Sequence, residues 1–400
     1  MKYNFDDSPL RRGTDSVKWR KFGDDVLPLW LADMDFASPE PVIRALRERV
    51  EHGVFGYPEG WEPTDLAEFR ELIVDRMLRR YGWRVQPEDV IIIGGVVAAM
   101  HIACHLVAGA GGQGAGVLIQ PPVYPPILNA HTVANLARHD AALARRTDGS
   151  YEVDFDVFAS AIRPETRLFI LSNPHNPVGR VFTRAELERM ARICLERGVV
   201  ICSDEIHCDL LYSGQQHVPI ASIDPEIAWN TITATAPTKT FNIAGLQCSV
   251  VVIPNPDLRQ RYQQARQGLV MWLNLMGQIA GQAAYRGGQE WLDQLLVYLE
   301  ANRDLVYDFV HRELPGVRMA KPQGTFLAWL DCRDAGMREG PFEFFVKHAR
   351  VALGDGATFG PGGEGFVRLN FGCTRATLLE ALERMKRALE RGQPSTASRR

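Results

Sequence analysis

The central part of the chain alternates short apolar segments with longer amphipathic ones, and this alternation restricts the fold more than any other feature. Helical patterns occupy residues 96–107 and 183–198. Apolar runs of strand length occupy residues 90–95, 116–122, 167–174, 199–205 and 231–237. Continuous apolar strands that alternate with helices are typical of an α/β fold, with a mainly parallel sheet covered on both faces. In such sheets, ligand-binding loops follow the carboxyl ends of the strands.

The pattern changes after residue 268. A long, mostly helical stretch is interrupted only at Gly287 and Gly288, and short strands and an amphipathic helix follow it. These elements are predicted at residues 275–311, 324–332, 365–372 and 376–392. We expect four regions, namely an N-terminal arm that forms part of a small domain, a large domain, the rest of the small α/β domain and a disordered polar tail. Their predicted bounds are 1–45, 46–285, 286–391 and 392–400.

Composition restricts the partners of the chain. The net charge is −3, with 46% hydrophobic and 23% charged residues, so no strong field attracts nucleic acid or an anionic membrane surface. No apolar run reaches the ~20 residues that span a bilayer, and the polar N-terminus lacks the apolar core of a signal peptide. The seven cysteines form no CxxC pair and mostly lie in apolar stretches. We expect a cytoplasmic protein with small-molecule or protein partners.

Two patterns resemble ligand sites but lack the required context. Gly109, Gly111 and Gly114 spell GxGxxG, yet a helix precedes them and a strand follows, the reverse of a dinucleotide-binding turn. His101 and His105 are one helical turn apart, but no glutamate and no third ligand accompany them. We therefore expect neither a nicotinamide site nor a metal site.

Three segments that follow predicted strands carry polar residues suited to one site. Lys239 lies in ATAPTKTFNIAG, where burial would lower the pKa of its amine and make it a nucleophile. Asp204 ends the strand VVICSDE at the same sheet edge and needs a cationic partner if buried. Asn176 lies in the rigid loop SNPHNPVGR and can aim an amide at a ligand. Taken singly, the three residues also fit a surface lysine, a turn-capping aspartate and an ordinary turn.

Together, these motifs in this order resemble the class I/II aminotransferase superfamily, the fold-type I enzymes that use pyridoxal 5′-phosphate (PLP). The likeness covers nearly the whole chain. It implies a large domain with a mainly parallel, seven-stranded type of sheet between helices and a smaller α/β domain. It also implies a Schiff-base lysine, a partner for the pyridine nitrogen, a donor to the ring hydroxyl, a stacking aromatic ring, phosphate-binding N–H groups and a carboxylate-binding arginine. By resemblance, Lys239 is the Schiff-base lysine, Asp204 the partner of the pyridine nitrogen and Asn176 the donor to the ring hydroxyl. Tyr124 is the stacking aromatic ring, Val96 and Val97 supply the phosphate-binding N–H groups, and Arg368 is the carboxylate-binding arginine.

The segments DSVKWRKF, LPLWLADMDF, HGVFGYPEG and DEIHCDLLYSG resemble the cystathionine β-lyase and cysteine-conjugate C–S lyase branch. By resemblance, Tyr57 reaches the phosphate of a neighbouring subunit, which implies a homodimer with shared sites. Some positions depart from the wider superfamily. His207 stands where many members carry a tyrosine near the ring oxygen, and Gln247 where many carry a phosphate-binding arginine. Ala236 replaces a common serine, whose hydroxyl Thr238 can supply.

The resemblance implies α,β-elimination of L-cystathionine or other S-conjugates of L-cysteine to pyruvate, ammonia and a thiol. Lys239 would act as base on Cα, with Tyr124 and Asp204 also in the catalytic set, while Arg368 and Asn176 bind the substrate. Transamination of an amino acid uses the same residues and stays an alternative. A regulatory or binding protein that keeps the fold without turnover is a further alternative from another class.

Overall fold

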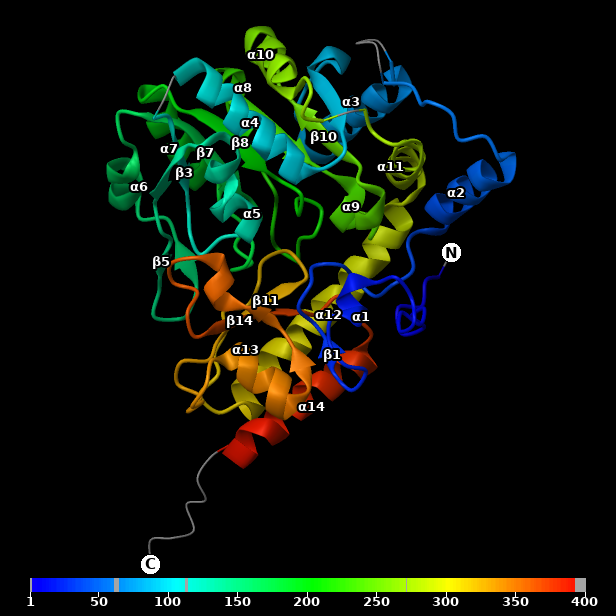
Figure 1. The fold of residues 1–400 in the computed structure, drawn as a ribbon, viewed down its shortest axis with the longest axis vertical. Coiled ribbons are helices and arrows are strands. Elements are labelled where there is room, and N and C mark those ends of the chain that lie inside the picture. Colours follow the sequence, from blue (N-terminus) through cyan, green and yellow to red (C-terminus); the bar gives the residue numbers. More distant parts are fainter. Residues whose placement is uncertain (1, 61–64, 112–113, 271, 393–400) are drawn as a thin grey trace, which may run out of the picture.

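A computed structural model describes residues 2–60, 65–111, 114–270 and 272–392. In Figure 1 a large sheet with helices on both sides forms the upper part of the molecule, and smaller strands and helices form the lower part. Helix α12 (Gln289–Glu313) descends along the lower part, beside the N-terminal arm. No helix of the described residues is long and apolar enough to cross a membrane.

The large sheet has seven strands, and all but one run parallel. Only β10 is antiparallel to both of its neighbours, β2 and β9. In spatial order the strands are β2 (Val90–Ile93), β10 (Ser249–Val252), β9 (Thr231–Thr235), β8 (Val200–Asp204), β7 (Thr166–Ser172), β3 (Gly116–Ile119) and β4 (Ala137–Asp140). The mainly parallel sheet predicted from the apolar runs is therefore confirmed, whereas the strand β10 and its reversed direction were not predicted.

Both faces of the sheet are buried, which explains the unbroken apolar runs. Along β7, Leu168 and Ile170 enter a core with α4 and α10, while Phe169 and Leu171 enter the opposite core with α6 and α7. The helices around the sheet are α3 (Ala67–Tyr81), α4 (Val96–Gly111), α5 (Pro125–Leu128), α6 (Phe155–Ala161), α7 (Arg184–Glu196), α8 (Pro225–Trp229), α9 (Pro237–Thr240), α10 (Pro256–Arg266) and α11 (Leu275–Gly287).

The lower part contains a three-stranded antiparallel sheet and the last helices. Its strands are β11 (Leu327–Asp331), β14 (Phe366–Asn370) and β13 (Gly354–Asp355), with β14 in the middle. Its helices are α12, α13 (Pro341–Phe344) and α14 (Arg375–Gly392), and a π-helical turn occupies Phe345–Ala349. Two further short strands, β5 (Ala144–Arg145) and β6 (Tyr151–Glu152), pair with each other in an antiparallel hairpin.

The N-terminal arm joins the two parts. It contains α1 (Val17–Arg20), β1 (Leu27–Pro28) and α2 (Glu40–His52). Strand β1 pairs in parallel with β12 (Val351–Ala352) of the lower part, whereas α2 packs against α11 of the upper part. The irregular residues between β1 and α2 therefore pass between the two parts.

The helical stretch predicted over residues 275–311 is present as two helices that meet at Gly288. A side chain there would clash, because a Cβ would lie 2.5 Å from the Ala284 oxygen and 2.6 Å from the Phe241 ring. We propose the boundary between large and small domains near residues 285–286, just before this junction. Apart from residue 392, the predicted tail lies outside the described residues.

Candidate active site

The polar residues predicted from the sequence gather at the carboxyl edge of the large sheet. In the strand register, Asp204 at the end of β8 pairs with Ser172 of β7 and Ala234 of β9. Asn176 follows β7, and Lys239 lies on the short helix α9 after β9. Because parallel strands end at one edge, residues far apart in sequence meet there.

Lys239 projects from α9 toward the N-terminal arm. Its Nζ donates a hydrogen bond to the carbonyl oxygen of Ala32 at 2.6 Å. Desolvation of the amine lowers the pKa of Lys239 to about 8, and the positive charge of Arg368 acts in the same direction. Asp33 and Asp204 oppose this shift. An amine with this pKa is partly neutral near physiological pH, as a nucleophile or base requires.

Asp204 is a buried carboxylate that has no cationic partner within salt-bridge distance among the described residues. It accepts one hydrogen bond, from the backbone N–H of Ile206 at 3.1 Å. Burial raises the pKa of Asp204 to about 7. A buried carboxylate in this state favours a ligand that brings a positive charge or a proton on nitrogen.

Arg368 is a buried cation that has no carboxylate partner in the described part of the chain. It lies on β14, with Nη1 donating to Asn176 Oδ1 at 3.0 Å and Nη2 to the Trp30 carbonyl at 3.0 Å. Its Nε is buried without a hydrogen-bond partner, and its guanidinium lies 5.0 Å above the Phe359 ring. Burial lowers the pKa of Arg368 to about 10. This arrangement suits a carboxylate ligand, which a guanidinium can bind through two nitrogens.

Tyr124 and His207 lie near these charges. Tyr124 precedes α5, and its backbone N–H donates to the Asn176 carbonyl at 3.0 Å. Burial raises the pKa of its phenol. Burial, with Lys239 and Arg368 nearby, lowers the pKa of His207 to about 3, so the imidazole is neutral at physiological pH. Its Nδ1 is buried without a partner.

The predicted anion-binding residues lie at the start of α4. Val96 and Val97 form the first turn of this helix, directly after Gly95, whose φ is +148°. The first N–H groups of a helix have no partner within it and attract anions. The Gln247 carbonyl comes within 3.7 Å of where a Cβ on Gly94 would lie, so residue 247 borders the same turn. Thr238 is buried on α9, beside Lys239.

Tyr57 is the one predicted residue that lies apart from the others. Its side chain is 83% exposed, and its ring meets Trp272 edge-on at 5.9 Å.

The site also contains groups that the motifs did not indicate. Trp30 and Ala32 contribute only backbone carbonyls, and Asn242 holds the same arm through bonds to the carbonyls of Met34 and Phe36 at 3.0 and 2.7 Å. Because a carbonyl is common to every residue, no side-chain pattern could reveal these contacts. The one available signal was that LPLWLADMDF resembles the lyase branch.

The residues satisfy the requirements of PLP. The amine of Lys239 can carry an aldehyde, uncompensated Asp204 can pair with a protonated pyridine nitrogen, and the start of α4 can receive a phosphate. Arg368 remains free to bind the carboxylate of an amino acid. Among the described residues, no group of three or more His, Cys, Asp or Glu side chains is arranged to hold a metal ion.

Comparisons with known proteins give the family of the chain. The family model described as aminotransferase class I and II matches residues 24–385. Cystathionine beta-lyase PatB of Bacillus subtilis is 42% identical over 96% of this chain and 100% of that protein. Cystathionine beta-lyase of Corynebacterium glutamicum is 32% identical over 94% of this chain and 96% of that protein.

Solved structures give the same result. The crystal structure of OvoB has a TM-score of 0.90 and 41% identity, covering 97% of this chain and 99% of that one. Cystalysin of Treponema denticola, which contains pyridoxal 5′-phosphate, has a TM-score of 0.90 and 32% identity, covering 98% and 100%. The PLP-bound C-S lyase of Staphylococcus hominis has a TM-score of 0.88 and 33% identity, covering 97% and 99%.

Proposed function

Since this chain belongs to the aminotransferase class I and II family, we propose that it is a PLP-dependent carbon–sulfur β-lyase. It cleaves L-cystathionine or another S-conjugate of L-cysteine to pyruvate, ammonia and a thiol. The single observation that carries this proposal is the set of uncompensated buried charges, Asp204 and Arg368, around the amine of Lys239. The relatives named cystathionine beta-lyase support the reaction class.

The chain's own residues would hold the cofactor from several sides. Lys239 carries it through the amine, Asp204 keeps the pyridine nitrogen protonated, and Tyr124 covers the ring face. Asn176 and His207 would bind the ring oxygen. The N–H groups of Val96 and Val97, the Thr238 hydroxyl and the partner subunit's Tyr57 would hold the phosphate. When bound, PLP stabilises the negative charge that develops at the substrate Cα, so that a thiolate can leave from Cβ.

Arg368 binds and orients the substrate. Its guanidinium receives the α-carboxylate, and the bonds to Asn176 Oδ1 and the Trp30 carbonyl set its plane before the substrate arrives. Because Arg368 has no acidic partner in the described part of the chain, a substrate carboxylate displaces no internal ion pair. Pre-orientation of this kind lowers the entropy loss on binding.

Lys239 moves the proton. As a free amine, Lys239 would take the proton from the substrate Cα. Its pKa of about 8 leaves a useful fraction of neutral amine at physiological pH. The Ala32 carbonyl, which accepts a hydrogen bond from Nζ, restricts the free amine to one side of the site.

Transamination is a second candidate, because relatives 25–27% identical to the chain are named aspartate aminotransferase. The two reactions share their residues and differ in products. The test records the visible absorption of the purified protein and then adds L-cystathionine with lactate dehydrogenase and NADH. A visible cofactor band, lost in Lys239→Ala, together with NADH oxidation without a keto-acid acceptor, supports the β-lyase. Turnover only with a keto-acid acceptor supports the aminotransferase, and no band after PLP is supplied contradicts both.

We also propose that the enzyme is a homodimer with shared sites and that it acts in the cytoplasm. Val54, Phe55 and Tyr57 are more than half exposed in one segment, an apolar surface that a second subunit would cover. All seven cysteines are free and buried, as in proteins of reducing compartments. Sedimentation of the holoenzyme tests the dimer. Mixing inactive Lys239→Ala with inactive Tyr57→Ala tests the sharing, because mixed dimers would regain one complete site.

A further inference from the structure

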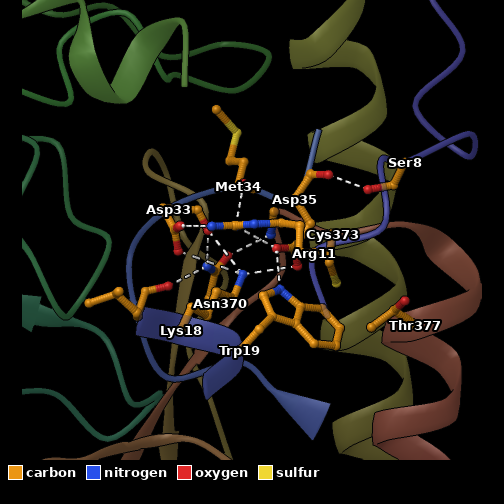
Figure 2. Close-up of polar contacts among 12 residues, drawn as sticks. Ser8, Arg11, Lys18, Trp19, Asp33, Met34, Asp35, Asn370, Cys373 and Thr377 are labelled. Atoms are coloured by element: carbon orange, nitrogen blue, oxygen red, sulfur yellow. Dashed lines mark hydrogen bonds and ion pairs between the residues drawn. The ribbon is translucent and has the colours of Figure 1, made fainter. Parts of the chain in front are cut away.

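The N-terminal arm contains a cluster of buried and half-buried charges outside the residues used so far. We name Arg11, Lys18, Asp33 and Asp35 the arm charge cluster. Lys18 has no exposed side-chain surface, and its Nζ donates to Asp35 Oδ2 and to the Asp33 carbonyl, both at 3.0 Å. Arg11 donates to Asp33 Oδ2 at 2.7 Å and to Asp35 Oδ1 at 2.8 Å. Figure 2 shows these side chains converging, with Trp19 below them.

The cluster is balanced and strongly constrained. It holds two cations and two carboxylates, and Trp19 Nε1 adds a hydrogen bond to Asp35 Oδ1 at 2.9 Å. Removing a lysine from water is costly, and several charge-assisted bonds to one ammonium are needed to offset this cost. The charge-assisted bonds of this cluster add geometric specificity to the packing of the arm. The residues that it restricts are those from Trp30 to Asp35.

Residues 30–35 form no helix or strand, so their backbone groups are free to contact the site. The Trp30 carbonyl accepts from Arg368 at 3.0 Å, and the Ala32 carbonyl accepts from Lys239 at 2.6 Å. Asn370 Nδ2 donates to the carbonyls on either side of Ala32, those of Leu31 and Asp33, at 2.6 and 2.7 Å. Two active-site cations are thus bonded to one short irregular segment.

One residue connects the cluster directly with this segment. Asp33 binds Arg11 through its side chain and accepts from Lys18 and Asn370 through its carbonyl. It directly follows Ala32, whose carbonyl holds Lys239. A change in the position of Asp33 therefore moves the Ala32 carbonyl with it.

We propose that Lys18 and Arg11 are positioning residues for carbon–sulfur cleavage. By locking Asp33 and Asp35, they hold the Ala32 carbonyl against Lys239 and the Trp30 carbonyl against Arg368. The base and the carboxylate-binding arginine, which come from different parts of the molecule, are thereby held in fixed relation to each other. The inference deepens the proposed function and rests on it for the roles of Lys239 and Arg368.

The cluster also acts on Lys239 through its charge. The charged and titratable groups that face the amine are Asp33 on the arm, Asp204 and His207 at β8, and Arg368 on β14. Among these, Asp33 acts to raise the pKa of Lys239, and its effect exceeds that of Asp204. A substitution in the cluster should therefore change the pKa of Lys239 even though it touches neither cofactor nor substrate.

The test compares Lys18→Met with Lys386→Met, the same substitution at a half-buried lysine that forms an ion pair with Glu313 at 2.7 Å. Full-length protein freed of cofactor is mixed with PLP over a range of pH, and the growth of the visible band is timed. Because only the neutral amine attacks the aldehyde, the rate reports the pKa of Lys239. We expect Lys18→Met to raise this pKa above about 8, Asp33→Asn to lower it, and Lys386→Met to leave it unchanged.

The second measurement is steady-state pyruvate release by the holoenzymes. We expect kcat/KM of Lys18→Met to fall about tenfold or more, since small displacements of catalytic groups reduce rates steeply. A folded Lys18→Met protein with the wild-type pKa and wild-type kcat/KM would overturn the proposal. If Lys18→Met fails to fold, Arg11→Gln, at a side chain that is 22% exposed, is measured instead with the same expected directions. If wild type binds PLP but releases no pyruvate, the proposed function fails, while the pKa comparison still decides the positioning role.

Discussion

Lys18 of the N-terminal arm and Lys239, which contacts this arm, differ in how their charge is balanced. Lys18 is paired with Asp35 and bonded to the Asp33 carbonyl, and its cluster is electrically complete. Lys239 has only a carbonyl as hydrogen-bond partner, and it stands near Asp204 and Arg368, neither of which has an ion-pair partner among the described residues. Buried charge that is balanced internally indicates a scaffold, whereas buried charge left unbalanced indicates where a ligand supplies the missing partner.

The largest effect expected from this comparison follows removal of the unbalanced lysine. Lys239→Ala should reduce pyruvate release by roughly 10³-fold or more, because it removes both the attachment point and the base. Coupled assay with lactate dehydrogenase measures this loss. Lys347→Ala, at an exposed ion pair with Glu339, is the control and should retain wild-type activity. Substantial activity in Lys239→Ala would contradict the role given to this amine.

The next effect concerns the stability of the cofactor-free protein. The pKa of Asp204 is raised to about 7 from the model-compound value of 3.8, so folding favours its protonated form. This contribution is present below about pH 4 and is lost as the pH rises to about 7. Its size is about 4 kcal/mol, taking roughly 1.4 kcal/mol per pKa unit. Urea unfolding at pH 4.5 and pH 8 should show this loss in wild type and not in Asp204→Asn. An equal change in the free energy of unfolding between these two pH values in both proteins would argue against an unbalanced carboxylate at Asp204.

Loss of a charge from the balanced arm charge cluster should destabilise the protein. Lys18→Met leaves Asp35 buried with one cation fewer, so the free energy of unfolding should fall by about 3 kcal/mol. Lys386→Met removes the partly exposed pair with Glu313 and should cost about 1 kcal/mol or less. Denaturant unfolding of the two variants measures the difference. Equal small losses would mean that the arm charge cluster contributes no more than a surface ion pair.

The smallest expected effect concerns substrate binding. Arg368→Lys keeps the charge but removes the planar fork that binds a carboxylate through two nitrogens. We expect KM for L-cystathionine to rise roughly 10- to 100-fold, from the ~1.5–3 kcal/mol of a hydrogen bond to a charged group. A lower kcat with unchanged KM would instead place the arginine in the chemical step.

Much of the fold followed from residue patterns. The apolar runs predicted β2, β3, β7, β8 and β9, and the structure contains all five with the parallel arrangement expected of doubly covered strands. The membership in the aminotransferase family and the fold type are confirmed by the comparisons. Strand β10 was not predicted, although its run SVVVIP is as long as the run VIIIGG that predicted β2. Its reversed direction could not be predicted, because nothing in a run of apolar residues determines the direction in which a strand pairs.

The candidate site likewise contains residues that could be predicted from the sequence and residues that could not. Lys239, Asp204 and Asn176 could be predicted because each is a distinctive side chain at or shortly after the end of a strand, and the order of the strand ends follows from the chain. Their roles stay predictions until variants are measured. The contribution of the arm could not be predicted, because Trp30 and Ala32 act through carbonyls that every residue has. Lys18 could not be recognised either, since one lysine in a charged segment looks like any other.

The sequence by itself determined the alternation of strands and helices, the apolar faces that bury the sheet, and the chemical groups available after each strand. These properties depend on side-chain type and on spacing along the chain, which are local. Only the tertiary structure decided which charges find partners. Arg11 and Lys18 form ion pairs with Asp33 and Asp35, whereas Asp204 and Arg368 form no ion pair among the described residues. The hydrogen-bonded charge pairs of the arm lie 17–24 positions apart, and Arg368 lies 192 positions from its partner Asn176. Distances of both kinds are set only when the arm and the two parts have packed together.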